Sequence, residues 1–208
     1  MKIVALSDIH NDYSMSIPDG DVVIFAGDMS YIGEEKDLIR FNEWFKSLPH
    51  KHKLYIPGNH DYLFETAPSL AQELVGSGTY LHTKEITTIE GVTFYGSPYT
   101  PIFSRWAFMM TPEELMHHWS TVPQVDVLVT HGPPKNILDA NLNGEPCGCP
   151  WLAYEIMNRI KPEIHIFGHI HEGYGTTTIG DTRFYNVSIM NRFYNPVNPV
   201  TIIDFEKE

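Results

Sequence analysis

Cysteine is almost absent from this sequence, which contains only Cys147 and Cys149, in a C-G-C stretch. Two cysteines are too few for a structural zinc site, and their close spacing is unfavourable for a disulfide bond, so we expect a reducing compartment. We interpret the pair as packing within a glycine- and proline-rich loop, residues 132–150, with redox regulation as the alternative. This loop directly follows His131, so we expect it to form a lid over a site.

Long apolar runs are absent as well. No segment approaches the roughly 20 apolar residues that a membrane span requires. The N-terminal stretch MKIVALSDIH reaches Asp8 before it could form the apolar region of a signal peptide. The sequence therefore predicts a cytoplasmic protein that does not associate with a membrane.

Basic residues are scarce, because 14 lysines and arginines stand against 26 aspartates and glutamates, for a net charge of -12. This negative charge argues against a basic surface for long nucleic acids or anionic membranes. It does not exclude a phosphate-containing substrate, because bound metal ions can reverse the local charge. With 208 residues, 42% of them hydrophobic, and no repeat or linker, we expect one domain over residues 1–208. Nothing in the composition indicates an oligomeric state.

Short apolar runs rich in valine and isoleucine recur along the chain and predict buried strands. They cover residues 2–7, 21–26, 53–57, 125–130 and 163–167. Apolar residues at helical spacing predict helices, the second of which opens with a capping box of Thr111 and Glu114. The predicted helices cover residues 34–48, 111–119 and 150–160. Residues 86–96 and 176–189 are typical of hairpins and 200–206 of a final strand, which together predict an α/β fold with two packed sheets flanked by helices.

Each of the five apolar runs ends in side chains of the kind that bind metals. These are Asp8 and His10, then Asp28, then Asn59, His60 and Asp61, then His131, and finally His169 and His171. Functional groups in open α/β sheets collect beyond the carboxyl ends of the strands, so we expect these side chains to converge. Carboxylate and imidazole ligands suit Mn, Fe or Zn. Alone, Asp8 could cap a helix and Asn59 could serve a turn, but five such strand ends together favour a metal site.

The remaining histidines do not follow strands in this way. We interpret all six as structural or solvated: His50, His52, His82, His117, His118 and His165. Tyr99, Phe103 and Trp106 follow the first predicted hairpin and could stack on a nucleobase. Aromatic residues in such a segment more often pack against the core, so we expect packing, with base stacking as the alternative.

The polar motifs resemble those of a known family. DIH at 8–10, GD at 27–28, GNHD at 58–61, TH at 130–131 and GHIH at 168–171 match, in this order, the motifs of the calcineurin-like metallophosphoesterases. The stretches YGSPYTPIFSRWAF, THGPPKNILD and FGHIHEGYG resemble the metallophosphoesterase-domain-containing (MPPED, or 239FB-like) subgroup. Relatives of this subgroup are class III phosphodiesterase-like enzymes, some of which act on cyclic nucleotides. The resemblance implies a four-layer α/β/β/α sandwich of two mixed β-sheets flanked by helices.

The resemblance also implies a role for each motif. One metal would be held by Asp8, His10, Asp28 and His171, and a second by Asp28, Asn59, His131 and His169. Asp28 would bridge the two ions, His60 would be the catalytic histidine, and Asp61 would orient it. One departure is Tyr31, which stands where many family members have a second aspartate. This position is outside the implied ligand set, so the departure affects only the support of the ligands.

This arrangement predicts hydrolysis of a small phosphodiester, with cyclic nucleotides among the expected substrates. We expect two divalent or mixed-valence ions, with Mn foremost and Fe, Zn, Co or Ni as alternatives. Together with two aspartates and a bridging hydroxide, these ions would leave a net charge of about +1, which suits a phosphodiester monoanion. The hydroxide would attack phosphorus in line, while Asn59 and His60 stabilise the developing charge and His60 protonates the leaving group. The alternatives are a phosphomonoesterase, a nuclease or a non-catalytic metal-binding scaffold. The acidic composition disfavours the nuclease, and the complete set of motif residues disfavours the scaffold.

Overall fold

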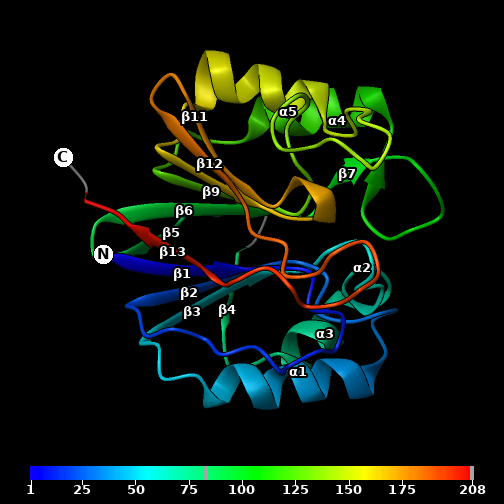
Figure 1. Cartoon of the computed structure of the whole chain (residues 1–208), viewed down its shortest axis with the longest axis vertical. Coiled ribbons are helices and arrows are strands. Elements are labelled where there is room, and N and C mark those ends of the chain that lie inside the picture. Colours follow the sequence, from blue (N-terminus) through cyan, green and yellow to red (C-terminus); the bar gives the residue numbers. More distant parts are fainter. Residues whose placement is uncertain (82–83, 207–208) are drawn as a thin grey trace.

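Two β-sheets lie face to face between two layers of helices in the computed structural model, which describes residues 1–81 and 84–206. Figure 1 shows α1 and α3 outside one sheet and α4 and α5 outside the other. The predicted four-layer sandwich of two mixed sheets is therefore confirmed. The prediction for His82 lies outside the described residues.

The first sheet has five strands in the order β13-β1-β2-β3-β4. They are β1 (Lys2–Leu6), β2 (Val22–Ala26), β3 (His52–Ile56), β4 (Thr79–Tyr80) and β13 (Thr201–Asp204). Strands β1 to β4 run parallel, and β13 pairs antiparallel with β1. The carboxyl ends of β1, β2 and β3, where the first three polar motifs begin, therefore lie at one edge.

The second sheet has six strands in the order β11-β12-β10-β9-β6-β5. They are β5 (Thr87–Ile89), β6 (Val92–Ser97), β9 (Val127–Thr130), β10 (Ile164–Phe167), β11 (Gly175–Ile179) and β12 (Thr182–Asn186). The four inner strands are parallel, and the edge strands β5 and β11 close the two predicted hairpins. A small two-stranded sheet joins β7 (Thr100–Pro101) to β8 (Met109–Met110).

The predicted helices form, together with two short ones that the sequence did not indicate. The α-helices are α1 (Glu35–Ser47), α2 (Leu63–Thr66), α3 (Pro68–Leu74), α4 (Pro112–Thr121) and α5 (Pro150–Glu155). The predicted capping box at α4 is confirmed, since Thr111 and Glu114 each bond the other's backbone N–H. Helix α5 continues as a π-helical turn, η1 (Ile156–Ile160), because the N–H of Lys161 bonds the carbonyl of Ile156. A 3-10 turn, η2 (His171–Gly173), follows β10.

Both faces of the parallel strands are buried, which explains their continuous apolar runs. On β1, Ile3 and Ala5 belong to the core between the sheets, whereas Val4 and Leu6 pack in the cluster with Phe41 of α1. None of the helices in the described part of the chain has the length and hydrophobicity of a membrane span.

The two sheets are joined beyond the carboxyl ends of their strands. The N–H of Ser7, just after β1, donates to the carbonyl of Val187, just after β12, and the N–H of Ile189 donates to the carbonyl of Ser7. A parallel β-bridge between Ser7 and Ser188 results. This junction brings the polar ends of the two sheets to a common location.

Candidate metal centre

The residues predicted to bind metals come together at this junction of the two sheets. Asp8, His10, Asp28, Asn59 and His131 are buried, and His169 and His171 are half-buried. Four of them have a left-handed backbone, namely Asp8 (φ 56°), His10 (φ 40°), Asp28 (φ 59°) and His169 (φ 69°). Non-glycine residues rarely adopt this conformation, and such strain concentrates at functional sites.

Gly168 allows the two sheets to approach closely at the site. A Cβ atom at this position would collide with the side chains of Ser7 and Asp8. Without it, the backbone N–H of His169 reaches the Asp8 carboxylate, at 3.1 and 3.0 Å from its two oxygens. The glycine before the HIH sequence is thus required by close packing across the junction.

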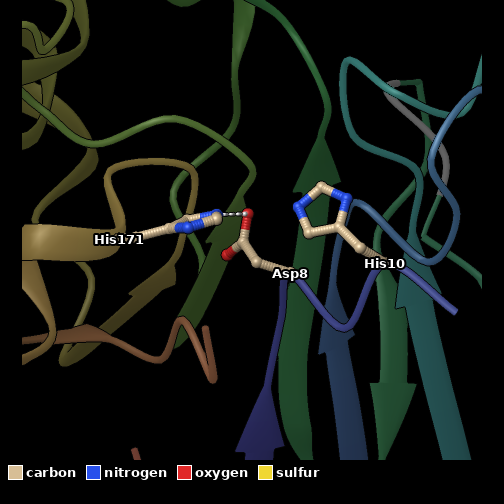
Figure 2. Close-up of side chains that lie close together, drawn as sticks. All are labelled: Asp8, His10 and His171. Atoms are coloured by element: carbon tan, nitrogen blue, oxygen red, sulfur yellow. Dashed lines mark ion pairs between the residues drawn. The ribbon is translucent and has the colours of Figure 1, made fainter. Parts of the chain in front are cut away.

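Potential ligand atoms form three overlapping groups within which all atoms lie inside 4.8 Å of one another. These groups are Asp8, His10 and His171; Asp28, His131 and His169; and His10, Asp28 and His60. Figure 2 shows the first group, with Asp8 between the two imidazoles and its carboxylate facing His171. Asp28 shares one group with His10 and another with His131 and His169, which is the position expected for a carboxylate between two metal ions.

Four histidines of the site are oriented by backbone carbonyl groups. Their Nδ1 atoms contact carbonyl oxygens as follows: His10 with Ser30 (3.1 Å), His60 with Tyr31 (2.7 Å), His131 with Ala26 (3.0 Å) and His171 with Asn191 (3.0 Å). Because a carbonyl oxygen only accepts, each Nδ1 must carry the hydrogen. The Nε2 atom of each neutral ring then has a free lone pair, as metal-ligating histidines require.

These Nε2 atoms face the two aspartates. The distances to Asp28 Oδ2 are 3.3 Å for His131, 3.8 Å for His10 and 4.0 Å for His60, and His171 lies 3.6 Å from Asp8 Oδ1. The Asn59 side-chain oxygen is also 3.0 Å from His131 Nε2. His10 Nε2 is buried and has no hydrogen-bond partner among the described residues. Lone pairs that point toward one another with no hydrogen-bond donor between them are the arrangement that a bound cation requires.

The electrostatics of the site support this interpretation. Burial opposes the charged form of Asp28, but the nearby histidines hold its pKa well below the usual range, and His171 does the same for the pKa of Asp8. Burial alone would lower the pKa of His131 and His171, but the adjacent carboxylates raise each pKa to about 9. The two carboxylates therefore stabilise positive charge at the positions of these imidazoles, and a bound cation would supply such charge.

Asp61 does not orient His60, contrary to our expectation from the sequence. Its buried carboxylate accepts hydrogen bonds from the backbone N–H groups of Asp28, Met29, Ser30 and Gly58 and from the Ser30 hydroxyl. His60 is instead held by the Tyr31 carbonyl and by Trp106, whose ring stacks on it at 4.1 Å between centroids. The sequence suggested Asp61 because it is adjacent to His60. The hydrogen-bond partner of His60 is instead a backbone carbonyl distant in sequence.

A pocket of about 570 Å³ opens over the site. Its lining includes Asp28, Asn59 and His60, together with the apolar side chains of Ile102, Phe103 and Trp106. Tyr99 instead packs against Phe108 and His118, with ring centroids 5.9 and 4.9 Å away. Of the three aromatic residues considered from the sequence, Phe103 and Trp106 therefore face the pocket, and Tyr99 belongs to the core.

The loop of residues 132–150 forms part of the pocket wall, because Leu142 and Cys147 line it. Both cysteines are free, as predicted. The buried sulfur of Cys149 accepts a hydrogen bond from the N–H of Leu152 at the start of α5 (3.4 Å), which confirms its packing role.

The other described histidines lie outside the ligand groups. His165 Nε2 contacts Thr130 Oγ1 (2.8 Å) within the core, and His118 Nε2 contacts Ser97 Oγ (2.9 Å). His50 contacts the Pro18 carbonyl (2.9 Å), His52 lies 3.9 Å from Glu90, and His117 is exposed on α4.

Sequence reasoning missed three residues of the site: Asn191, Arg192 and Tyr194. The Asn191 carbonyl orients His171, and the other two side chains line the pocket. They follow no strand and belong to no motif that we recognised. The one available signal is a repeated pattern, asparagine followed five residues later by proline, at 141–146 and 191–196.

Comparison with known proteins agrees with this geometry. The family model for calcineurin-like phosphoesterases matches residues 1–173. Metallophosphoesterase domain-containing protein 1 of Homo sapiens is 36% identical over 230 residues, which cover 98% of this chain and 70% of that protein. A UPF0046 protein of Caenorhabditis elegans is 34% identical over 224 residues, covering 95% of this chain and 79% of that protein. A solved crystal structure that is 16% identical shares the fold, with a TM-score of 0.68 over 89% of both chains. The chain belongs to the calcineurin-like phosphoesterase family, and this membership implies metal-dependent hydrolysis of phosphoesters at a dinuclear centre.

Proposed function

We propose that this protein is a phosphodiesterase that hydrolyses small phosphodiesters, with manganese as its preferred metal. One observation carries the proposal: Asp28 belongs to two groups of potential ligand atoms and lines a pocket that His60 also lines. Asp8, His10 and His171 would hold one ion, Asn59, His131 and His169 the other, and Asp28 both. Oxygen and imidazole ligands without thiolate suit Mn²⁺.

The charge of the ligand set favours a diester over a monoester. Asp8 and Asp28 are its only carboxylates, and Asn59 contributes a neutral oxygen. When bound, two divalent ions supply a water deprotonated near neutral pH and a positive charge beside the phosphoryl oxygens. The excess positive charge is small, which matches the single charge of a diester better than the double charge of a monoester.

The protein's own residues orient the substrate and the departing proton. Asn59, whose side-chain oxygen lies 3.0 Å from His131 Nε2, lines the pocket, where its amide would stabilise charge on the phosphoryl oxygens. The Tyr31 carbonyl and the Trp106 ring hold His60 so that its Nε2 faces Asp28. From this position, protonated His60 gives its Nε2 proton to the leaving oxygen. Asp61 acts through the backbone by fixing the loop that carries Asp28.

Cyclic nucleotides are compatible with the pocket and are our first candidates among small diesters. Phe103 is 57% exposed and lies 5.3 Å from the His169 ring between centroids, so a nucleobase next to the centre would contact it. The net charge of -12 continues to disfavour a long nucleic acid.

A turnover panel tests the proposal. Manganese-loaded protein is assayed with bis(4-nitrophenyl) phosphate, 2',3'-cyclic AMP and 4-nitrophenyl phosphate, alongside the His60→Ala variant. We expect both diesters to be hydrolysed faster than the monoester, and the variant to lose about 100-fold in kcat. A faster monoester would establish a phosphomonoesterase instead. No turnover of any of the three would leave the metal-binding scaffold as the better description.

A further inference from the structure

Two turns beside the pocket share one hydrogen-bonding pattern. In residues 140–146, the N–H of Asn141 donates to the carbonyl of Glu145 (3.0 Å). The Asn141 side-chain oxygen accepts from the N–H groups of Asn143 (2.9 Å) and Glu145 (3.0 Å). A β-bridge between Ala140 and Pro146 closes the turn.

Residues 190–196 repeat this pattern at each position. The N–H of Asn191 donates to the carbonyl of Asn195 (2.9 Å), and its side-chain oxygen accepts from the N–H groups of Phe193 (2.9 Å) and Asn195 (3.2 Å). A β-bridge between Met190 and Pro196 closes this turn as well. The residue after the asparagine is Leu142 in the first turn and Arg192 in the second, and both line the pocket over the metal centre.

The turns differ where the backbone is left-handed. The first turn has Gly144 there (φ 77°), whereas the second has Tyr194 (φ 57°). A bulky residue in this conformation is strained, and glycine would remove the strain. The Tyr194 ring contacts His10 and His171, at 4.8 and 5.3 Å between centroids, and lines the pocket. A strained tyrosine that packs on two potential metal ligands indicates a functional turn.

Arg192 is the cationic residue that this turn presents. It is exposed, and it lines both the main pocket and a neighbouring pocket of about 360 Å³. Its guanidinium lies 4.3 Å from the Phe193 ring centroid. Glu172 lines the same two pockets, yet no ion pair joins it or any other described carboxylate to Arg192. Arg192 also lies beyond residues 1–173, which the family model matches.

We propose that the turn of residues 190–196 is a recognition element in which Arg192 binds an anionic group on the organic part of the substrate. The proposal rests on the proposed function and adds a substrate class, namely phosphodiesters that carry a carboxylate or a second phosphate. The reacting phosphoryl group is served by Asn59 and His60 at the pocket floor. Arg192 is exposed at the border of two pockets and so faces a different part of the substrate. A guanidinium binds either anion through paired hydrogen bonds.

A matched pair of diesters tests this assignment. The substrates are bis(4-nitrophenyl) phosphate and 4-nitrophenyl 4-carboxyphenyl phosphate, which differ in one nitro or carboxylate group. With the carboxylate diester, we expect Arg192→Gln to lower kcat/KM about tenfold, mainly through KM, and to change kcat/KM for bis(4-nitrophenyl) phosphate less than about twofold. Arg40→Gln on α1 removes the same charge away from the pockets and should affect neither. Equal losses on both substrates, or no loss on either, would overturn the proposal.

A binding measurement separates this proposal from the proposed function. Calorimetry compares phenyl phosphate with 4-carboxyphenyl phosphate on metal-loaded protein and requires no turnover. We expect the wild type to bind the carboxylate compound more tightly and Arg192→Gln to lose that preference. If neither diester is hydrolysed but the preference is present, the recognition turn stands and the phosphodiesterase proposal fails. Absence of a preference in the wild type would refute the recognition turn itself.

Discussion

The Asp61 carboxylate accepts a hydrogen bond from the backbone N–H of Asp28, with 3.0 Å between Oδ2 and N. It also accepts from the next two N–H groups, those of Met29 and Ser30, and from that of Gly58. One buried carboxylate thereby ties the loop after β2 to the loop after β3. The position of Asp28 depends on a residue that contacts it only through the backbone.

Replacing Asp61 should therefore damage both stability and metal binding. In Asp61→Asn the amide NH₂ faces backbone N–H groups, so buried donors lose their acceptor. We expect the free energy of unfolding to fall by about 2–3 kcal/mol and the metal content to fall below two ions per chain. Denaturant unfolding and elemental analysis measure the two effects. The exposed Asp181→Asn is the control. A variant with wild-type stability and two bound ions would contradict this role.

Metal counting should distinguish His171 from Asp28. In His171→Ala we expect selective loss of the ion held with Asp8 and His10, because His171 belongs to that ligand group alone. Asp28→Asn should abolish binding of the pair, since its carboxylate belongs to two groups. Elemental analysis after dialysis gives the stoichiometry, with the exposed His117→Ala as control. Two tightly bound ions in Asp28→Asn would disprove the shared carboxylate.

His165 should make stability depend on pH. Burial lowers its pKa to about 3, so the ring stays neutral in the folded protein while the unfolded chain binds a proton below about pH 6.5. Acidification therefore favours the unfolded state, and the contribution of His165 to stability is lost as pH falls from about 6.5 towards 3. Relative to His165→Leu, we expect the wild type to lose about 2 kcal/mol between pH 7.5 and pH 5.

Urea unfolding at several pH values measures the difference in free energy of unfolding between the wild type and His165→Leu. The same measurement compares the wild type with His117→Leu as a control. His117 is exposed on α4, so its replacement should leave the pH dependence unchanged. If the stability difference between wild type and His165→Leu is constant across this range, His165 binds its proton over the same pH range in the folded protein as in the unfolded chain, which contradicts the prediction.

Tyr194 should be dispensable for stability and important for activity. Tyr194→Gly relieves the left-handed backbone at φ 57°, which offsets the lost ring contacts, so we expect a free energy of unfolding within about 1 kcal/mol of the wild type. We expect kcat/KM for diesters to fall at least about fivefold. The matched change is Gly144→Ala in the other turn, which places a side chain at φ 77° and should destabilise by about 1 kcal/mol. Full activity in Tyr194→Gly would argue against a functional turn.

The strands and the convergence of the polar side chains at their ends could be predicted from the sequence, because both depend on local patterns. Helices outside the sheets and the facing sheet bury both faces of β1, which makes its run of apolar residues continuous from Ile3 to Leu6. Parallel strands then place their carboxyl ends together, so the order of the motifs is sufficient to predict convergence. Helices α2 and α3 were not predicted, because they are short and Pro68 begins the second directly after the first.

The support of the ligands could not be predicted, because it comes from backbone atoms. The carbonyls of Ser30, Tyr31, Ala26 and Asn191 orient the site's histidines, and a carbonyl has no sequence signature. At Tyr31, too, the contact with the site comes from the backbone. Its carbonyl contacts His60, so this contact does not require an aspartate side chain at position 31.

The junction at Ser7 and Ser188 places the centre between two sheets whose proposed ligands are synthesised at different times. Asp8, His10, Asp28 and Asn59 come from the first half of the chain, whereas His131, His169 and His171 come from the second. A ribosome-bound chain that ends before residue 131 contains two carboxylates, one imidazole and one amide of this set but lacks its three later imidazoles. The complete ligand set therefore exists only when the two sheets are docked, so bound ions would stabilise the docked arrangement over the separated sheets.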